Sequence, residues 1–550
     1  MKSFGTYLVL LLGGALVFAA SFPNPVFTQG LSFLAWVAYV PVFWVIRRTG
    51  TGALVPLGAF YGYLSYFFFA PWLRTFHPLG GIFACSLQLF YMALLFPLLK
   101  LALLLYPRRG YLLQWFIWLA YEYLRTMGFL GFSYGITGYT QWQILPVIQI
   151  ASITGVWGVS ALVLFPSVYL AGVLESPAAE PGRTAGGEIA RKNGAAKKTA
   201  GGAQGFFHRE AVPALIWGVA LAGTVIFGLV SPADYAARPA ARLALIQQNA
   251  DPWKADTFGK NRRILKTLTG LSQEALAAES DTDLVVWPET AFVPRIFWHL
   301  NYRDDAESYE LVEELLDFLA PQRIPFLIGN DDGRLEVTRR GRWDRVDYNG
   351  ALLFRGAEIS GVYRKMHLVP FTEYFPYERI FPRLYRALAG AGTHFWEPGR
   401  EAVVFNTGKI RFSSPICFED TFGYISRDFT RNGAELIVNL SNDGWANSLS
   451  CQMQHLAMAV FRAVENRRSL VRSTATGQTC AIDPYGKILA MAEPFTPAFL
   501  NVRVPLLTNI SPYTRWGDIW GGLFVFCALL LLLIGVIPGI LRSIKTGRNA

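Results

Sequence analysis

Residues 401–420 read "EAVVFNTGKIRFSSPICFED", a hydrophobic run that ends on a single cysteine, Cys417, followed by Glu419 and Asp420. A cysteine at the end of an apolar strand is usually a small buried hydrophobic residue. A thiol becomes a nucleophile when a proton acceptor or a positive charge lies beside it. The rest of the chain therefore decides whether Cys417 packs or reacts.

Short apolar runs alternate with amphipathic segments between residues 241 and 505. The runs "DLVVWPET", "GVYRKMHLV", "RFSSPICFED" and "AELIVNLSND" are typical of buried strands, and "TCAIDPYGKILA" is typical of a hairpin. Helices are predicted over 259–279, 306–320 and 450–466. This pattern predicts an α/β domain, which we place at residues 232–513.

Three polar side chains follow predicted strands of this domain. Glu289 follows "DLVVWP", Lys365 follows "ISGVYR", and Cys417 follows "FSSPI". Reactive groups of α/β sheets gather beyond the carboxyl ends of strands. Each residue alone has another explanation: a helix cap for Glu289, a solvated strand end for Lys365 and packing for Cys417. Together they supply a base, an electrostatic stabiliser and a nucleophile.

The chain as a whole is too apolar for a soluble enzyme. Of its 550 residues, 52% are hydrophobic and 16% are charged, which indicates a polytopic membrane protein. The net charge of +11 does not indicate nucleic-acid binding, because basic residues in so apolar a chain belong to cytoplasmic membrane edges. Eight membrane spans are predicted, at residues 4–20, 27–46, 51–70, 79–105, 111–127, 146–174, 211–230 and 518–541. Seven form a bundle over residues 1–231, and the eighth lies with a tail in residues 514–550.

Lys and Arg gather in alternate loops between the predicted spans, and basic loops resist translocation. These loops hold Arg47 with Arg48, Arg108 with Arg109, the linker near 176–210 and the tail after residue 541. Both termini and the linker are therefore expected in the cytoplasm, with the α/β domain on the periplasmic side of a bacterial inner membrane. The linker is rich in Ala, Gly, Lys and Pro, and we expect it to be disordered.

The order Glu, Lys, Cys within "WPET", "YRKMHLVPFTEY" and "PICFED" resembles the carbon-nitrogen hydrolase (nitrilase) superfamily, whose fold is an αββα sandwich. With the membrane spans added, nearly the full chain resembles the bacterial apolipoprotein N-acyltransferase family. "SFPNPVF", "YEYLRTMGF", "IQIASITGVWGVS" and "VNLSNDGWA" carry this resemblance. It implies transfer of an acyl chain from a phospholipid, typically phosphatidylethanolamine, to the α-amino group of the diacylglyceryl-cysteine of an apolipoprotein, the step that completes lipoprotein maturation.

The resemblance makes Glu289, Lys365 and Cys417 the catalytic triad and matches Glu373 to a second essential glutamate of the family. Phe418 stands where many members have Tyr, so any hydrogen bond from that hydroxyl is missing, whereas Glu419 is kept.

A free cysteine has a pKa near ~8.5, so we expect Glu289 to take the proton of Cys417. We expect Lys365 and nearby backbone N–H groups to stabilise the oxyanion. A thioester on Cys417 and ping-pong kinetics follow.

The segments after Glu289 and Lys365 are unusually aromatic, namely "FVPRIFWHL", "FTEYFPYERIFPRLY" and "HFWEP". Aromatic loops suit a membrane interface, and we expect them to cover the site and admit acyl chains. Packing against the bundle is an equally good explanation for any single ring. The same two explanations apply to Trp253, Phe418 and Trp445, the candidate substrate-binding residues.

Five cysteines and six scattered histidines indicate neither a disulfide framework nor a metal site, and no cofactor is expected. Whether Cys451 and Cys480 pair stays open. Within the fifth predicted span, Glu122 and Arg125 have the i, i+3 spacing of an ion pair, which is either structural or functional.

Two other functions share parts of this pattern. A membrane-anchored amidase or nitrilase would use the same triad, but seven helices exceed what anchoring needs. A transporter with a periplasmic accessory domain would require discontinuous helices and charges at mid-membrane, and the predicted spans contain few charges.

Overall fold

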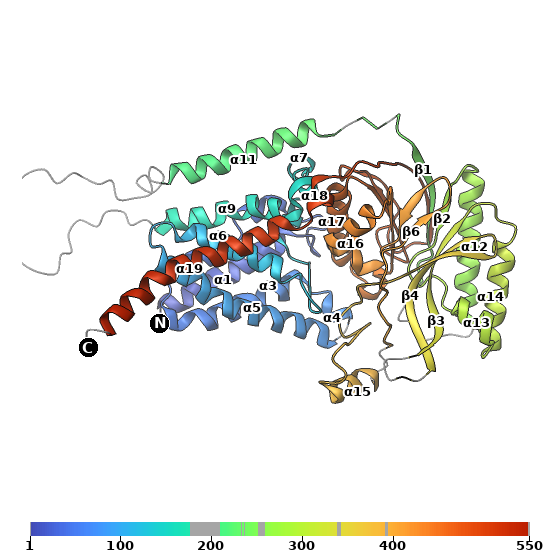
Figure 1. The fold of residues 1–550 in the computed structure, drawn as a ribbon, viewed down its shortest axis with the longest axis horizontal. Helices are drawn as coiled ribbons and strands as arrows, with labels where there is room; N and C mark the ends of the chain where they lie inside the picture. The colour runs from blue at the N-terminus through green and yellow to red at the C-terminus, as the bar shows by residue number, and fades with distance from the viewer. Residues whose placement is uncertain are drawn as a thin grey trace, which may run out of the picture.

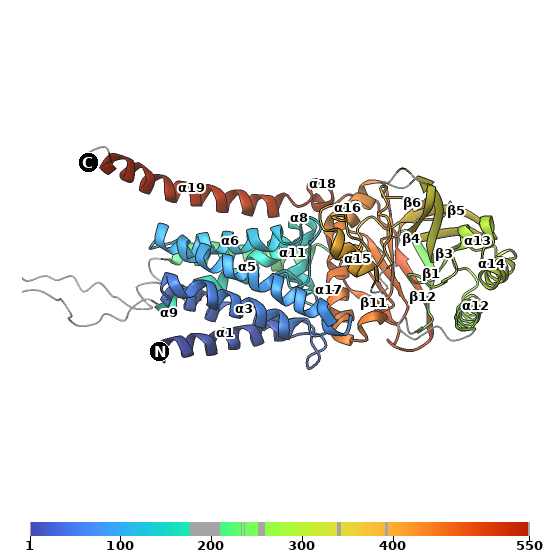
Figure 2. The same cartoon turned by 90° about the horizontal axis from the view of Figure 1, so that it is seen from below.

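A computed structural model describes residues 2–76, 78–175, 210–232, 234–235, 237–250, 259–337, 341, 343–390 and 394–547. A helical bundle forms one end of the molecule and a domain of two sheets forms the other (Figure 1). Both chain ends lie at the end of the bundle that faces away from the sheets (Figures 1 and 2). Trp253 and the linker 176–209 lie outside the described residues.

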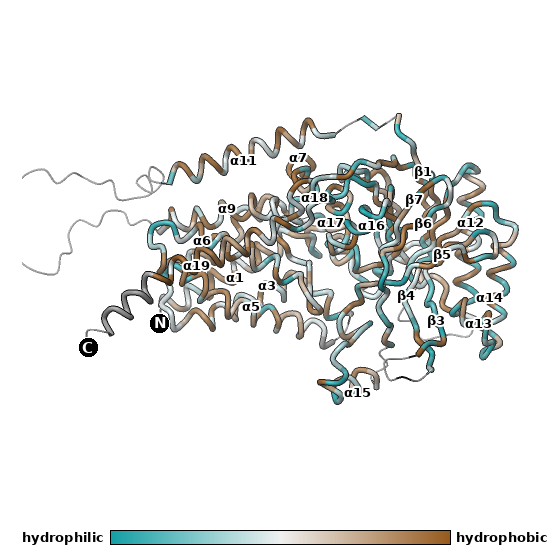
Figure 3. The backbone as a smooth tube through the Cα atoms, viewed as in Figure 1, coloured by the Kyte–Doolittle hydropathy of each residue, from teal (hydrophilic) through white to brown (hydrophobic). Residues whose placement is uncertain are grey.

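Among the described residues, six helices are long and apolar enough to cross a membrane. They are α1 (Lys2–Ser21), α3 (Leu54–Phe69), α5 (Pro78–Leu105), α9 (Val156–Glu175), α11 (Ala211–Val230) and α19 (Ile519–Gly547). They run side by side, and their residues are mostly hydrophobic along the whole length of the bundle (Figures 2 and 3). These helices coincide with six of the eight predicted spans.

The other two predicted spans contain shorter helices. The span 27–46 divides into a 3-10 turn, Ser32–Trp36, and α2 (Val40–Arg48), which has 9 residues. The span 111–127 contains α6 (Gly110–Leu124), whose 15 residues extend about 22 Å, short of a hydrocarbon core of about 30 Å. The predicted span 146–174 also begins with two short helices before α9, namely α7 (Leu145–Ile148) and α8 (Ala151–Thr154). The count of eight spans thus stays a prediction.

Two glycines allow α3 and α5 to approach closely. A Cβ atom on Gly58 would lie 2.4 Å from the Met92 carbonyl oxygen, and one on Gly62 would lie 2.4 Å from that of Gln88. Small residues four positions apart are a common device for packing membrane helices backbone to backbone. Any side chain at Gly58 or Gly62 would push the two helices apart.

The domain contains two six-stranded sheets, in the orders β12-β1-β2-β3-β4-β5 and β11-β10-β9-β8-β7-β6. The first sheet comprises β1 (Ala240–Gln247), β2 (Leu284–Val286), β3 (Phe326–Val337), β4 (Trp343–Arg355), β5 (Glu358–Arg364) and β12 (Ala498–Pro505). The second comprises β6 (Val404–Asn406), β7 (Arg411–Ser413), β8 (Leu436–Ser441), β9 (Ser469–Thr474), β10 (Cys480–Ile482) and β11 (Ile488–Met491). Strands β1, β2 and β3 are parallel, as are β7, β8 and β9, and antiparallel strands complete each sheet.

The sheets pack face to face, with helices on both outer sides. Successive residues of β1 alternate: Leu243 and Leu245 pack toward the other sheet, whereas Ala244 and Ile246 pack toward the helices. Helices α12 (Lys260–Ala278), α13 (Ile296–Tyr302) and α14 (Ala306–Leu319) cover the first sheet, and α16 (Gly423–Arg431) and α17 (Leu449–Asn466) cover the second (Figure 1). The predicted αββα sandwich is therefore confirmed, as are its three predicted helices and the hairpin β10–β11.

Several strands end earlier than the apolar runs that predicted them. Strand β2 ends at Val286, two residues before Pro288, and β7 ends at Ser413, two residues before Pro415. Proline has no N–H to continue a ladder, so the chain turns there. Strand β5 likewise ends at Arg364, which makes Lys365 the first residue beyond the sheet.

Helix α17 connects the sandwich to the bundle. Its Gln454 accepts a hydrogen bond from Trp72 Nε1 at 3.0 Å and donates to the carbonyl oxygens of Pro23 at 2.8 Å and Phe69 at 3.0 Å. Farther along the junction, Arg467 donates to Gln149 Oε1. These buried polar contacts fix the sandwich on the end of the bundle.

Candidate active site

The predicted triad residues converge at the ends of strands from both sheets. Glu289 follows β2, Lys365 follows β5, and Cys417 begins a 3-10 turn, Cys417–Thr421, that follows β7. All three are buried, with exposed fractions of 6%, 1% and 7%. Lys365 Nζ lies 3.2 Å from Glu289 Oε1 and 2.9 Å from Glu373 Oε1. One buried ammonium is thus shared by the two glutamates.

Donors on both oxygens orient the Glu289 carboxylate. Asn349 Nδ2 donates to Oε1 at 2.9 Å, and the backbone N–H of Asn442 donates to Oε2 at 3.0 Å. Together with Lys365, these donors hold the Glu289 carboxylate in a single orientation inside the site. Sequence reasoning missed the role of Asn349, although an asparagine within the predicted buried strand "YNGALLF" was a signal.

The surroundings of Cys417 favour the protonated thiol. Burial raises its pKa well above the usual value, the Glu289 carboxylate raises it further, and the Lys365 ammonium opposes them. Its backbone has φ of 50°, a left-handed conformation that is rare outside glycine and occurs at strained turns of functional sites. A thiol in this state needs a proton acceptor before it can attack, which matches the predicted role of Glu289.

Glu419 ties the Cys417 turn to the segment after Lys365. Its Oε1 accepts hydrogen bonds from the backbone N–H groups of Met366 at 2.7 Å and His367 at 3.0 Å. Its Oε2 accepts from the N–H of Ile416 at 2.8 Å, and the Tyr363 hydroxyl lies 2.8 Å from both oxygens. Burial raises the pKa of Glu419 to about 6. Glu419 therefore positions two parts of the site rather than contacting a substrate.

The aromatic candidates pack inside the protein. The Phe418 ring is buried, with centroids 5.0 Å from Phe422 and 5.8 Å from His367. Trp445 is half-buried and packs edge to face on Trp72 of the bundle, at 5.7 Å between centroids. Both contacts agree with the packing explanation, and they place Trp445 at the junction of sandwich and bundle.

The aromatic loop after Lys365 also reaches the bundle. Phe129, just beyond α6, lies with its ring centroid 5.4 Å from those of Phe371 and Tyr377. Phe83 of α5 packs on Phe371 at 5.1 Å. Downstream, Ile380 is strongly exposed at the start of an arm that continues as α15 (Pro382–Gly390) and projects from the sandwich (Figure 1).

A cavity of about 1100 Å³ lies at the junction beside this loop. Its wall on the sandwich side includes Met366 and His367, which directly follow Lys365. Its wall on the bundle side includes Ile519, Leu523 and Phe526 of α19, which are all exposed. The cavity is therefore apolar toward the bundle and adjoins the triad segment on the other side.

The remaining candidate residues have structural partners. Glu122 Oε1 accepts hydrogen bonds from Thr137, whereas Arg125 donates to the Tyr66 hydroxyl, so each of the two has its own partner. Among the described residues, Cys451 and Cys480 are both free thiols, which answers the question left open by the sequence.

Comparisons with known proteins agree with both parts of the fold. Residues 242–507 match the family model of carbon-nitrogen hydrolases, and residues 13–169 match that of the apolipoprotein N-acyltransferase N-terminal domain. Apolipoprotein N-acyltransferase 1 of Treponema pallidum (strain Nichols) is 44% identical over 555 residues, covering 99% of this chain and 98% of its own. Apolipoprotein N-acyltransferase 1 of Treponema denticola is 42% identical over 542 residues, covering 96% and 95%. A solved amidase of the nitrilase superfamily from Nesterenkonia covers 50% of this chain and 93% of its own, at 19% identity and a TM-score of 0.35.

Proposed function

Since this chain belongs to the apolipoprotein N-acyltransferase family, we propose that it moves an acyl chain from phosphatidylethanolamine to diacylglyceryl apolipoproteins through a thioester on Cys417. The observation that carries the proposal is the buried Lys365 ammonium. Its Nζ lies 3.2 Å from Glu289 Oε1 and 2.9 Å from Glu373 Oε1, and its positive charge lowers the pKa of the Cys417 thiol against the effect of burial. Membership in this family favours acyl transfer over a membrane-anchored amidase and over a transporter.

In the first half-reaction, Glu289 takes the proton of Cys417 as the sulfur attacks the ester carbonyl of the phospholipid. Negative charge develops on the carbonyl oxygen, and the Lys365 ammonium stabilises it. The C–O bond then breaks, and Glu289 returns the proton to the departing oxygen. A lysophospholipid leaves, and the acyl group stays on Cys417 as a thioester.

In the second half-reaction, the α-amino group of the apolipoprotein attacks the thioester, and Glu289 takes a proton from the nitrogen. The C–S bond breaks, an amide forms, and the proton passes from Glu289 to the sulfur of Cys417. Because the two half-reactions share one carboxylate and one cation, the same site serves both substrates in turn.

The charge pattern of the bundle supports a periplasmic site with both termini in the cytoplasm. The Tyr7 hydroxyl, near the amino terminus, donates to the Arg48 carbonyl oxygen, and Lys100 donates to that of Arg47. Tyr106, beside Arg108, donates to the Leu531 carbonyl oxygen in the middle of α19. The amino terminus lies at the end of the bundle that faces away from the sandwich (Figure 2), so Arg48, which Tyr7 contacts, and its neighbour Arg47 lie at that end. Basic residues mark the cytoplasmic side of a bundle.

The cavity at the junction supports a lipid donor. Its exposed apolar residues on α19 suit acyl chains, while Arg427 of α16, which lines the cavity and pairs with Asp428, suits a phosphate group. Burial of the triad limits the access of water, which favours transfer over hydrolysis of the thioester, and we expect the aromatic loop that packs on Phe129 to add to this exclusion.

Labelled phospholipid tests the proposal. The full-length protein, in nanodiscs that contain phosphatidylethanolamine with a labelled acyl chain, should retain one labelled chain that C417A does not retain. The variant C480A, which removes another buried cysteine of the second sheet, should retain it. Addition of a diacylglyceryl peptide should then move the label to the peptide amine. Absence of label on the wild type, or full transfer by C417S, would overturn the mechanism.

A further inference from the structure

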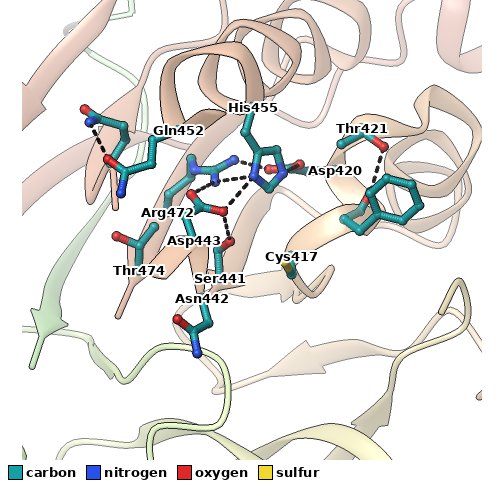
Figure 4. A network of polar contacts seen from close by, with 12 residues as sticks. Cys417, Asp420, Thr421, Ser441, Asn442, Asp443, Gln452, His455, Arg472 and Thr474 are labelled. Carbon is teal, nitrogen blue, oxygen red and sulfur yellow. Dashed lines mark hydrogen bonds and ion pairs between the residues drawn. The ribbon is translucent and has the colours of Figure 1, made fainter. Parts of the chain in front are cut away.

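Four charged side chains form a buried cluster beside Cys417, namely Asp420, Asp443, His455 and Arg472 (Figure 4). His455 Nε2 lies 2.5 Å from Asp420 Oδ1, and its Nδ1 lies 2.9 Å from Asp443 Oδ1. Arg472 binds the second oxygen of each carboxylate, at 3.1 Å for Asp443. The cluster is therefore a closed ring of two anions and two donors.

The two carboxylates favour the imidazolium form of His455. Each ring nitrogen faces a carboxylate oxygen, and the charged ring donates from both nitrogens, while Nδ1 also lies 3.2 Å from Arg472 Nη2. Although burial opposes the charge, the carboxylates of Asp420 and Asp443 raise the pKa of His455 to about 9. Interaction with His455 and Arg472 lowers the pKa of Asp443 to about 2 against the effect of burial. Two positive and two negative charges make the cluster neutral.

The cluster joins the turn that carries the nucleophile to the turn that binds its base. Asp420 belongs to the turn that Cys417 begins. Asp443 begins the next 3-10 turn, Asp443–Ala446, directly after Asn442, whose N–H binds Glu289 Oε2 at 3.0 Å. His455 on α17 bridges the two aspartates, so the chain of contacts runs from the Cys417 turn to Glu289.

We propose that His455 and Arg472 are positioning residues that set the Cys417 turn against the Asn442–Asp443 turn, which binds Glu289, and, by neutralising Asp420 and Asp443, allow Cys417 to lose its proton. This inference rests on the proposed role of Cys417 as the nucleophile. The cluster lies behind the site, and its members act through the two segments that they hold.

The neutrality of the cluster matters because Cys417 already faces several charges. The Glu289, Asp443 and Glu373 carboxylates each raise the pKa of its thiol, and only the Lys365 ammonium among its strongest charged neighbours lowers it. Loss of the His455 charge would leave one uncompensated anion in this buried region. Formation of a second anion, the thiolate, would then become harder.

The groups packed around His455 determine which substitutions can test its charge. Asp420 and Asp443 lie at its two ring nitrogens, Arg472 Nη2 lies 3.2 Å from Nδ1, and the Tyr134 ring packs against it with centroids 6.4 Å apart. H455Q keeps a hydrogen-bonding side chain in this space and removes only the positive charge. D443N removes one negative charge instead, so the two variants change the cluster in opposite directions.

The test measures the pH dependence of Cys417 alkylation by iodoacetamide in the full-length protein, read by mass spectrometry of the peptide that contains Cys417. H455Q should move the midpoint upward by about one pH unit or more. D443N should move it downward, and H455Q/D443N, which is neutral again, should return it toward the wild-type value. D443N keeps the test decisive if H455Q does not fold.

The control is Arg468→Gln, which removes a buried arginine that holds the Ala434 carbonyl at 2.7 Å outside the cluster. It should lower the melting temperature without moving the midpoint. An unchanged midpoint in H455Q or D443N would overturn the proposal and leave the cluster a packing feature. Alkylation needs no acyl donor, so a wild type that alkylates normally but transfers no acyl chain would count against the proposed function alone.

Discussion

Replacement of Lys365 by methionine should affect both the stability of the protein and the rate of acyl-enzyme formation, and the two effects can be measured separately. K365M keeps the apolar stem of the side chain and removes the ammonium. In the wild type this ammonium is buried, 3.2 Å from Glu289 Oε1 and 2.9 Å from Glu373 Oε1. The variant therefore leaves two carboxylates in one buried site without the cation that they share.

The expected loss of stability is about 3–5 kcal/mol at neutral pH, the usual effect of leaving a buried charge unpaired. Without the cation, the two carboxylates repel each other when both are ionised, and a lower pH relieves this repulsion by adding a proton to one of them. The deficit of K365M relative to the wild type should shrink between pH 7 and pH 5.

The rate of acyl-enzyme formation should fall by about 10²- to 10³-fold, the usual effect of removing one oxyanion donor. The assay pairs melting temperatures at pH 5 and pH 7 with the rate at which labelled acyl chain appears on Cys417. K365M/E373Q removes one of the repelling carboxylates, so it should regain most of the lost stability at pH 7 and none of the acylation. Acylation by K365M within threefold of the wild type, or its recovery in K365M/E373Q, would refute the reasoning.

Three further predictions concern other parts of the molecule. E419Q puts an amide group where four donors converge on the Glu419 carboxylate. The melting temperature should therefore fall, and acyl-enzyme formation should slow about tenfold. An unchanged rate would contradict the positioning role of Glu419. The pKa of His455 is raised to about 9, so its stabilising effect is complete below pH about 6.5 and is lost as pH rises through 9. Melting temperature should therefore decline over this range in the wild type more than in H455Q, and parallel curves would argue against a buried imidazolium. G58A places a Cβ atom 2.4 Å from the Met92 carbonyl oxygen and should lower the melting temperature, whereas G13A, with nothing within 4 Å, should not; equal melting temperatures would refute the close packing of α3 and α5.

Local pattern was enough to predict an α/β domain and the positions of Glu289, Lys365 and Cys417, whereas the resemblance to carbon-nitrogen hydrolases predicted the sandwich. Alternating apolar residues produce strands, and proline or a polar residue ends them, so side chains at strand ends can be read from neighbouring residues. Six of the eight predicted spans coincide with long apolar helices for the same reason. Hydropathy did not reveal that residues 111–127 contain a helix of only 15 residues, because a window measures composition and not where backbone hydrogen bonding ends.

The contacts that set the site depended on tertiary structure. Asn349 and the Asn442 N–H reach Glu289 from other strands and loops, and Glu419 joins segments that lie more than 50 residues apart in the chain. The pairing of His455 with Asp420 likewise spans 35 residues. Sequence periodicity records which face of an element is apolar, but not which distant polar group meets it. The sequence by itself therefore determined which chemical groups this protein has at its strand ends, and only the packing of two sheets and α17 decided how those groups are charged and held.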